Sequence, residues 1–213
     1  MHILAKAGLG IGAVAGISGA SYGIYNSMQS ILKSPEKTEA PSYAKELRGT
    51  LLSTKNNEDQ EKWTSRLTSL KSAGEGTLIE GLSTIKAKND VAIWTELRDW
   101  CRDNINNSSK GESDKEFKNI QSYCTFSIKE KIVHSISETE QDNSEKWQKA
   151  HEALKTISDE SQLDDKLKEA KNKENEEAKK AIKDWCTQAY KKPYKGTEDK
   201  EFKNASVICL SKN

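Results

Sequence analysis

The chain has 213 residues, of which 34 are basic and 33 acidic, so its formal net charge at pH 7 is +1. Acidic residues are interleaved with the lysines, and this balance argues against a nucleic-acid partner, because such partners select for basic surfaces. Hydrophobic residues make up only 34% of the chain, which predicts thin cores in small units that need covalent staples.

The first element is an uncharged run of 19 residues from Ala7 to Tyr25. A helix rises about 1.5 Å per residue, so a run of this length spans the hydrocarbon core of a bilayer. We therefore predict a membrane segment within residues 1–32, acting as an uncleaved signal anchor. A cleaved signal peptide is the alternative. Residues 33–45 contain two of the three prolines and are predicted to form a polar linker.

Three glycines of the membrane segment lie four residues apart, at Gly8, Gly12 and Gly16. On a helix they share one face, a pattern that allows two membrane helices to approach closely and makes a homo-oligomer an alternative to a monomer. The stretch from Gly10 to Ala15 also matches a dinucleotide-binding fingerprint. We reject that reading because no βαβ pattern surrounds it.

Beyond the linker the same pattern occurs twice. The hexapeptide DKEFKN at residues 114–119 returns unchanged at residues 199–204, and each copy contains a Trp-Cys pair followed by a second cysteine. This match indicates an internal duplication. We predict two tandem helical repeat units, at residues 46–128 and residues 129–213.

Helical periodicity recurs in both copies. A tryptophan is followed by side chains four and seven residues later, at Trp63, Leu67 and Leu70 and again at Trp147, His151 and Leu154. A longer apolar register then runs from Leu78 to Trp100 in the first copy and from Leu163 to Trp185 in the second. It predicts one long helix in each unit.

A short third helix is expected in each unit after a polar connection. Asp114 and Asp199 are suitable N-caps for it, because their carboxylates accept hydrogen bonds from the first free N–H groups. The fold class is therefore all-α, with two three-helix units after the membrane segment. The aromatic residues expected in the repeat cores are Trp63, Trp100, Phe117, Trp147, Trp185 and Phe202.

The four cysteines predict one disulfide in each unit, Cys101–Cys124 and Cys186–Cys209. Each bridge closes a loop of about 24 residues, worth about 3.4 kcal/mol in the chain-entropy model. Such bonds place the chain outside the reducing cytosol. The alternatives are a structural zinc site or four free thiols. Zinc sites usually contain closely spaced ligand pairs, which neither copy has, so we expect no metal and no cofactor.

Catalytic motifs are not found in the sequence: it has no HExxH, P-loop or GxSxG pattern. Asp114 and Glu116 are two residues apart and do not face each other on a helix, which weakens a paired-carboxylate reading. We therefore expect no catalytic residues and no enzyme activity, with a secreted hydrolase as the least favoured function.

The layout resembles the large paralogous families of uncharacterised proteins of haemotropic mycoplasmas. The similar features are the Gly/Ala-rich segment from Leu4 to Tyr25, the Ser/Pro linker and the repeated Trp … Trp-Cys … Phe … Cys units. The resemblance implies a membrane-associated protein of a wall-less bacterium, displayed at the surface and contributing to antigenic diversity or host-cell contact. These families have no established functional residues, so none is carried over.

Together these features predict a membrane-anchored surface protein of unknown molecular activity, with the chain after about residue 33 outside the cytosol. Its expected partners are the membrane and a host-cell or serum protein. The alternative is a self-associating structural protein of the envelope.

Overall fold

The computed structural model describes residues 40–88 and 93–211, which belong to one compact unit, Ala40–Asn213. The predicted membrane segment, with Ala7, Gly8, Gly12, Gly16 and Tyr25, lies outside the described residues. Among residues 40–88 and 93–211, no helix is both long enough and apolar enough to cross a membrane.

The described residues are all-helical, which confirms the predicted fold class. The helices of the first half are α2 (Tyr43–Glu46), α3 (Gln60–Lys71), α4 (Glu80–Ala87), α5 (Trp94–Asn104) and α6 (Lys115–Cys124). Those of the second half are α7 (Ile128–Lys131), α8 (Glu145–Lys155), α9 (Asp165–Lys171), α10 (Asn175–Tyr190) and α11 (Lys200–Ile208). One 3-10 turn, η2 (Glu160–Gln162), precedes α9.

Phe126 joins the two halves through its backbone. Its N–H donates to the Thr50 carbonyl at 2.8 Å in the first half, and its carbonyl accepts from the Tyr194 N–H at 2.7 Å in the second. We call residues 41–126 the first module and residues 126–211 the second module. The two modules therefore follow each other without a linker.

The outer ends of the modules repeat the same pairing. At the start of the first module, the Pro41 carbonyl accepts from the Ser109 N–H at 2.8 Å, as the Phe126 carbonyl does in the second. At the end of the second module, the Ser211 N–H donates to the His134 carbonyl at 2.7 Å, as the Phe126 N–H does in the first. Phe126 is thus both the last residue of one module and the first residue of the next.

The predicted three-helix units and the predicted linker both need correction. Each long apolar register is divided between two helices, α4 and α5 in the first module and α9 and α10 in the second. Asn175, at the start of α10, has a φ of 51°, a left-handed conformation that a continuous right-handed helix excludes. Each module therefore has four main helices after its short first one. Residues 43–45, assigned to the linker, belong to α2.

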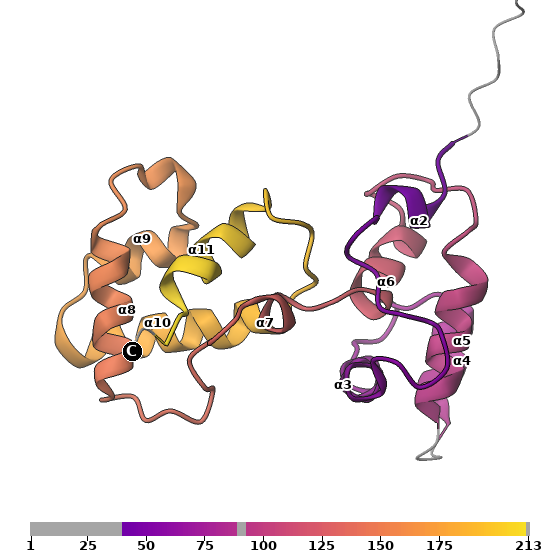
Figure 1. The fold of residues 1–213 in the computed structure, drawn as a ribbon, viewed down its shortest axis with the longest axis horizontal. Helices are drawn as coiled ribbons and strands as arrows, with labels where there is room; N and C mark the ends of the chain where they lie inside the picture. The colour runs from indigo at the N-terminus through magenta and orange to yellow at the C-terminus, as the bar shows by residue number, and fades with distance from the viewer. Residues whose placement is uncertain (1–39, 89–92, 212–213) are drawn as a thin grey trace, which may run out of the picture. The chain divides into compact units, whose positions relative to one another are not determined.

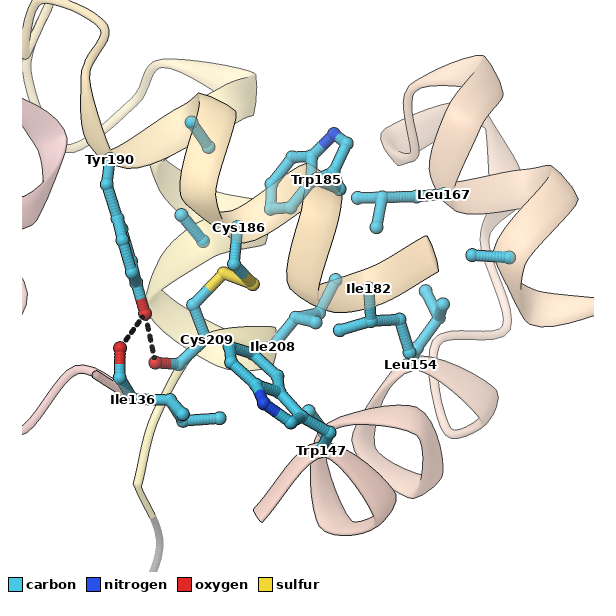
Figure 2. Close-up of a cluster of buried hydrophobic side chains, with 14 of the residues drawn as sticks. Ile136, Trp147, Leu154, Leu167, Ile182, Trp185, Cys186, Tyr190, Ile208 and Cys209 are labelled. Atoms are coloured by element: carbon cyan, nitrogen blue, oxygen red, sulfur yellow. Dashed lines mark hydrogen bonds between the residues drawn. A yellow bond between two sulfur atoms is a disulfide. The ribbon is translucent and has the colours of Figure 1, made fainter. Parts of the chain in front are cut away.

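Figure 1 traces the helices of both modules, and each module has its own hydrophobic core. The first is built around Trp63 of α3, and the second around Trp147 of α8, and both indoles are fully buried. Figure 2 shows the second core, where α8, α9, α10 and α11 contribute Leu154, Leu167, Ile182 and Ile208. The apolar register continues across the break between α9 and α10 because both helices pack on the same core.

Candidate functional site

The two predicted disulfides are confirmed. Cys101 of α5 is bonded to Cys124 at the end of α6, and Cys186 of α10 is bonded to Cys209 after α11. The Cα–Cα distances are 5.7 and 5.8 Å, and all four residues are buried. Figure 2 shows the second bridge inside its core. Each bridge joins the third and fourth main helices of its module, so it closes the core at the same place in both.

The aromatic residues expected in the repeat cores do not all lie equally deep. Phe202 is half-buried and packs edge-on against the Tyr194 ring, with 4.7 Å between the ring centroids. Trp100 is also half-buried and lies at the margin of the first core. Those that are buried are Trp63, Phe117, Trp147 and Trp185.

Trp100 and Trp185 occupy matched positions but have different surroundings. The Trp185 Nε1 donates to the Asp164 carboxylate at 2.6 Å, which fixes the indole over the second core. The Trp100 indole lies against Gly81, where an added Cβ would be 2.7 Å from its Nε1. The residue at the position of Gly81 in the second module is Lys166, whose Nζ donates to the Gln188 side chain at 3.0 Å. Glycine therefore determines where Trp100 lies.

The DKEFKN hexapeptide begins the last helix of each module. The Asp114 carboxylate accepts from the Glu116 N–H at 2.8 Å, and the Asp199 carboxylate accepts from the Phe202 N–H at 3.0 Å. Both aspartates are N-caps, as the sequence predicts. These carboxylates therefore serve the same capping role in both modules.

The final asparagine of the hexapeptide has a role that the sequence analysis missed. The Asn119 amide donates to the Thr77 carbonyl at 3.0 Å and accepts from the Ile79 N–H at 2.9 Å. The Asn204 amide donates to the Gln162 carbonyl at 3.0 Å. Both amides are buried and hold the loop before the second main helix. The signal was available in the sequence, since a polar residue was kept unchanged in both copies.

Replacing Asn204 by alanine leaves the Gln162 carbonyl without its donor, so we expect the second module to lose about 1–3 kcal/mol. Hydrogen exchange of the η2–α9 segment will report the opening of this loop. Asn172→Ala is the matched control, because the Asn172 amide donates to its own helix at an exposed site. Equal losses for the two variants would contradict the role of Asn204.

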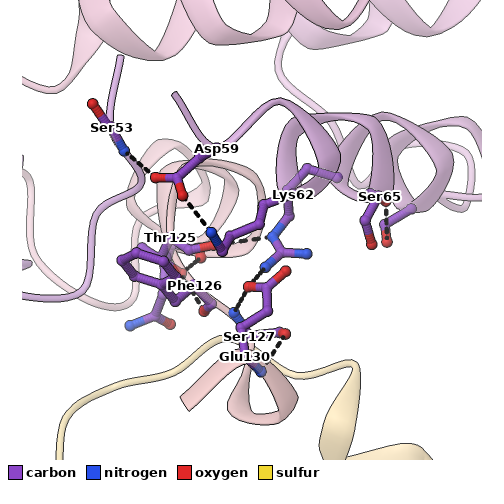
Figure 3. A network of polar contacts seen from close by, with 11 residues as sticks. Ser53, Asp59, Lys62, Ser65, Thr125, Phe126, Ser127 and Glu130 are labelled. Atoms are coloured by element: carbon purple, nitrogen blue, oxygen red, sulfur yellow. Dashed lines mark hydrogen bonds and ion pairs between the residues drawn. The ribbon is translucent and has the colours of Figure 1, made fainter. Parts of the chain in front are cut away.

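The contact across the module boundary is made by Arg66 of α3. Figure 3 shows its two partners, Thr125 and Glu130, beside Phe126. The Arg66 Nε donates to the Thr125 carbonyl at 3.0 Å, and its guanidinium forms an ion pair with Glu130 of α7. Only 6% of Arg66 is exposed. The Glu130 carboxylate also accepts from the Ser127 N–H at 2.7 Å, closing a capping box on α7. One carboxylate thus caps the first helix of the second module and binds the first module.

This boundary contact has no counterpart further along the chain. Arg66 lies three residues after Trp63, and the residue three after Trp147 is Ala150. Ala150 is buried in the second core and carries no charge. Arg66 is therefore specific to the boundary between modules and is not part of the duplicated pattern.

The Phe126 ring adds an aromatic contact to the boundary. The Lys131 Nζ lies 3.6 Å from the centroid of this ring, and the Lys62 Nζ lies 5.5 Å from it. Lys62 belongs to α3 of the first module and Lys131 to α7 of the second. A cation over an aromatic face is attracted by the ring quadrupole. The Phe126 ring therefore contacts side chains of both modules, and its backbone forms hydrogen bonds to both modules.

A groove of about 410 Å³ lies between α9 and α10 of the second module. It is lined by Ala170, Ala181 and Trp185 and by charged residues of both signs. The charged residues that line it are Lys166, Glu169, Lys173, Glu177, Lys180 and Asp184. A surface of this composition suits a protein segment with complementary charges better than a small apolar molecule.

No cluster of three or more metal-ligating side chains occurs within the described ranges. Comparison of the chain with protein-family models, curated proteins and solved structures found no match. The candidate site is therefore defined by residues alone, as the α9–α10 groove on a disulfide-stapled module.

Proposed function

We propose that the chain is a surface protein attached to a membrane by its N-terminal segment, with both modules outside the cytosol. The observation that carries this proposal is the pair of buried disulfides, one in each module. Bonds of this kind persist in oxidising compartments and are rare in the cytosol. The uncharged run from Ala7 to Tyr25 supports attachment to the membrane.

The activity that we propose is binding of a host-cell or serum protein, with the α9–α10 groove as the contact surface. The modules share their bridges and caps but differ at this surface. Ala181, which lines the groove, corresponds to Glu96 in the first module, and Lys180 corresponds to Thr95. Function depends on local sites carried by a shared scaffold, so this difference makes the groove our candidate for recognition by the second module.

The groove can be filled by replacing Ala181 with arginine. We expect the full-length protein in lipid nanodiscs to bind host cells or serum proteins, and the variant to bind at least about tenfold more weakly. Glu96→Arg places the same side chain on the first module and is the matched control. The melting temperature of each variant will show that the fold is retained.

Two results would overturn this proposal. One is a wild-type protein that binds neither host cells nor serum proteins. The other is protection of both modules from protease added to intact cells, which would place them on the cytosolic side.

Self-association as an envelope scaffold is the second candidate, favoured by the spacing of Gly8, Gly12 and Gly16. Replacing Gly12 by leucine is expected to separate an oligomer into monomers in mild detergent. Sedimentation of the wild-type protein as a monomer would reject this candidate.

A further inference from the structure

Two buried polar atoms of the second core have no hydrogen-bond partner: the Trp147 Nε1 and the His151 Nε2. They lie one turn apart on α8, and His151 is only 3% exposed. In the first module the Trp63 Nε1 donates to the Ser53 carbonyl at 2.9 Å. Leu67, four residues after Trp63, takes the position of His151. At these two positions the first module therefore has a paired indole and an apolar side chain, whereas the second has two unpaired polar atoms. Among the described residues, the unpaired polar atom of the first core is the Tyr43 hydroxyl, which lies elsewhere in the sequence and does not gain a charge in acid.

We propose that His151 makes the second module an acid-sensitive switch, which opens at α8 in mildly acidic solution while the first module stays folded. An unpaired Nε2 costs less free energy in a neutral imidazole than in an imidazolium. Protonation adds a charge and an N–H donor at a buried atom that has no acceptor, and an unpaired buried charge is strongly unfavourable. The module relieves this cost by exposing the ring to water.

The groups around His151 do not provide a counter-ion strong enough to retain the charge. On its own helix, Lys155 opposes protonation and Glu152 favours it more weakly. From α9, backbone hydrogen bonding at Lys171 and Ala170 favours protonation as well, but burial and the charge of Lys155 outweigh it. The other helices packed on α8 are α10 and α11, which bring apolar side chains such as Ile182 and Ile208 to this core.

The pH range follows from the direction of the pKa shift. Burial, followed by the charge of Lys155, lowers the pKa of His151 in the folded module below its ordinary value. An unfolded histidine has a pKa of about 6.5, so the unfolded chain binds the proton first as the pH falls. The free energy of opening is therefore largest above about pH 6.5 and decreases below it. Each unit of decrease in pH raises the equilibrium constant for opening by up to about tenfold. The loss ends below the folded pKa.

Hydrogen exchange of the full-length chain in mild detergent tests this switch, after correction for the intrinsic pH dependence of exchange. Between about pH 7.5 and pH 5.5, we expect the amides of α8 and α9 to lose up to about tenfold in protection. The amides of α3 and α4 are expected to keep theirs. This inference does not rest on the proposed binding function, because it is measured on the protein alone.

Two variants make the test specific. His151→Leu installs the residue of the first module and is expected to remove the loss of protection in α8. Leu67→His transfers the imidazole to the first module and is expected to produce the same loss in α3. The proposal is overturned if wild-type α8 keeps its protection at pH 5.5, if His151→Leu loses as much as wild type, or if both wild-type modules open together.

Discussion

Replacing Cys186 and Cys209 by alanine is expected to lower the free energy of unfolding of the second module by about 3.4 kcal/mol. The bridge joins residues 23 positions apart, and the loss of loop-closure entropy in the unfolded chain sets this magnitude. Small domains have total stabilities of about 5–15 kcal/mol, so this is a large fraction. Urea unfolding of the oxidised protein, read separately for each module by hydrogen exchange, measures it.

The first module provides the matched experiment. Cys101 and Cys124 have the same sequence separation, so their replacement by alanine is expected to destabilise the first module by a similar amount. A loss below about 1 kcal/mol in both modules would mean that the bridges do not act as the staples that thin cores require. A loss restricted to one module would show that the two cores differ more than their bridges suggest.

Arg66→Ala is expected to cost about 3 kcal/mol, because removing one partner of a buried ion pair leaves the other charge uncompensated. The variant also removes the donor to the Thr125 carbonyl. Side-chain exposure is 7% for Arg66 and 18% for Glu130, so the pair is not fully buried. We therefore expect a loss of stability near the lower end of the range that is typical of broken buried ion pairs. Urea unfolding followed by circular dichroism will give the change.

The same variant tests whether the modules unfold together. With Arg66 removed, we expect the urea midpoints of the two modules, read separately by hydrogen exchange, to lie further apart than in the wild type. Lys180→Ala is the control, since Lys180 and Asp184 form an exposed pair at i, i+4 that is worth about 0.3–0.5 kcal/mol. An Arg66 variant no less stable than the Lys180 variant would contradict the role of the boundary contact.

The first bridge lies close to the residue that the two modules share. Cys124 lies two residues before Phe126, the residue that both modules share. The bridge therefore holds the connecting segment on α5 while Phe126 pairs with Thr50 on one side and Tyr194 on the other.

Features that recur or that depend on near neighbours were predictable from the sequence. The cysteine pairs, the aspartate caps and the helix that contains each first tryptophan are of this kind, since each appears twice and acts over a few residues. The depth of Trp100 was not predictable, because it depends on Gly81, which comes from another helix.

Features that occur once were missed for a different reason. Arg66 and Glu130 are separated by 64 residues, and neither has a counterpart in the other copy that would draw attention to it. The break before Asn175 was also missed, because the apolar register passes through it unchanged. Periodicity reports which face meets the core and does not report where the backbone is interrupted.

The central claim is that two disulfide-stapled modules lie in an oxidising environment. Its most direct test is a disulfide map of the native protein, alkylated in intact cells and digested without reduction. We expect cross-linked peptides that contain Cys101–Cys124 and Cys186–Cys209, with no cysteine alkylated. Four alkylated thiols would contradict both the staples and the location, and would place the modules on the cytosolic side of the membrane.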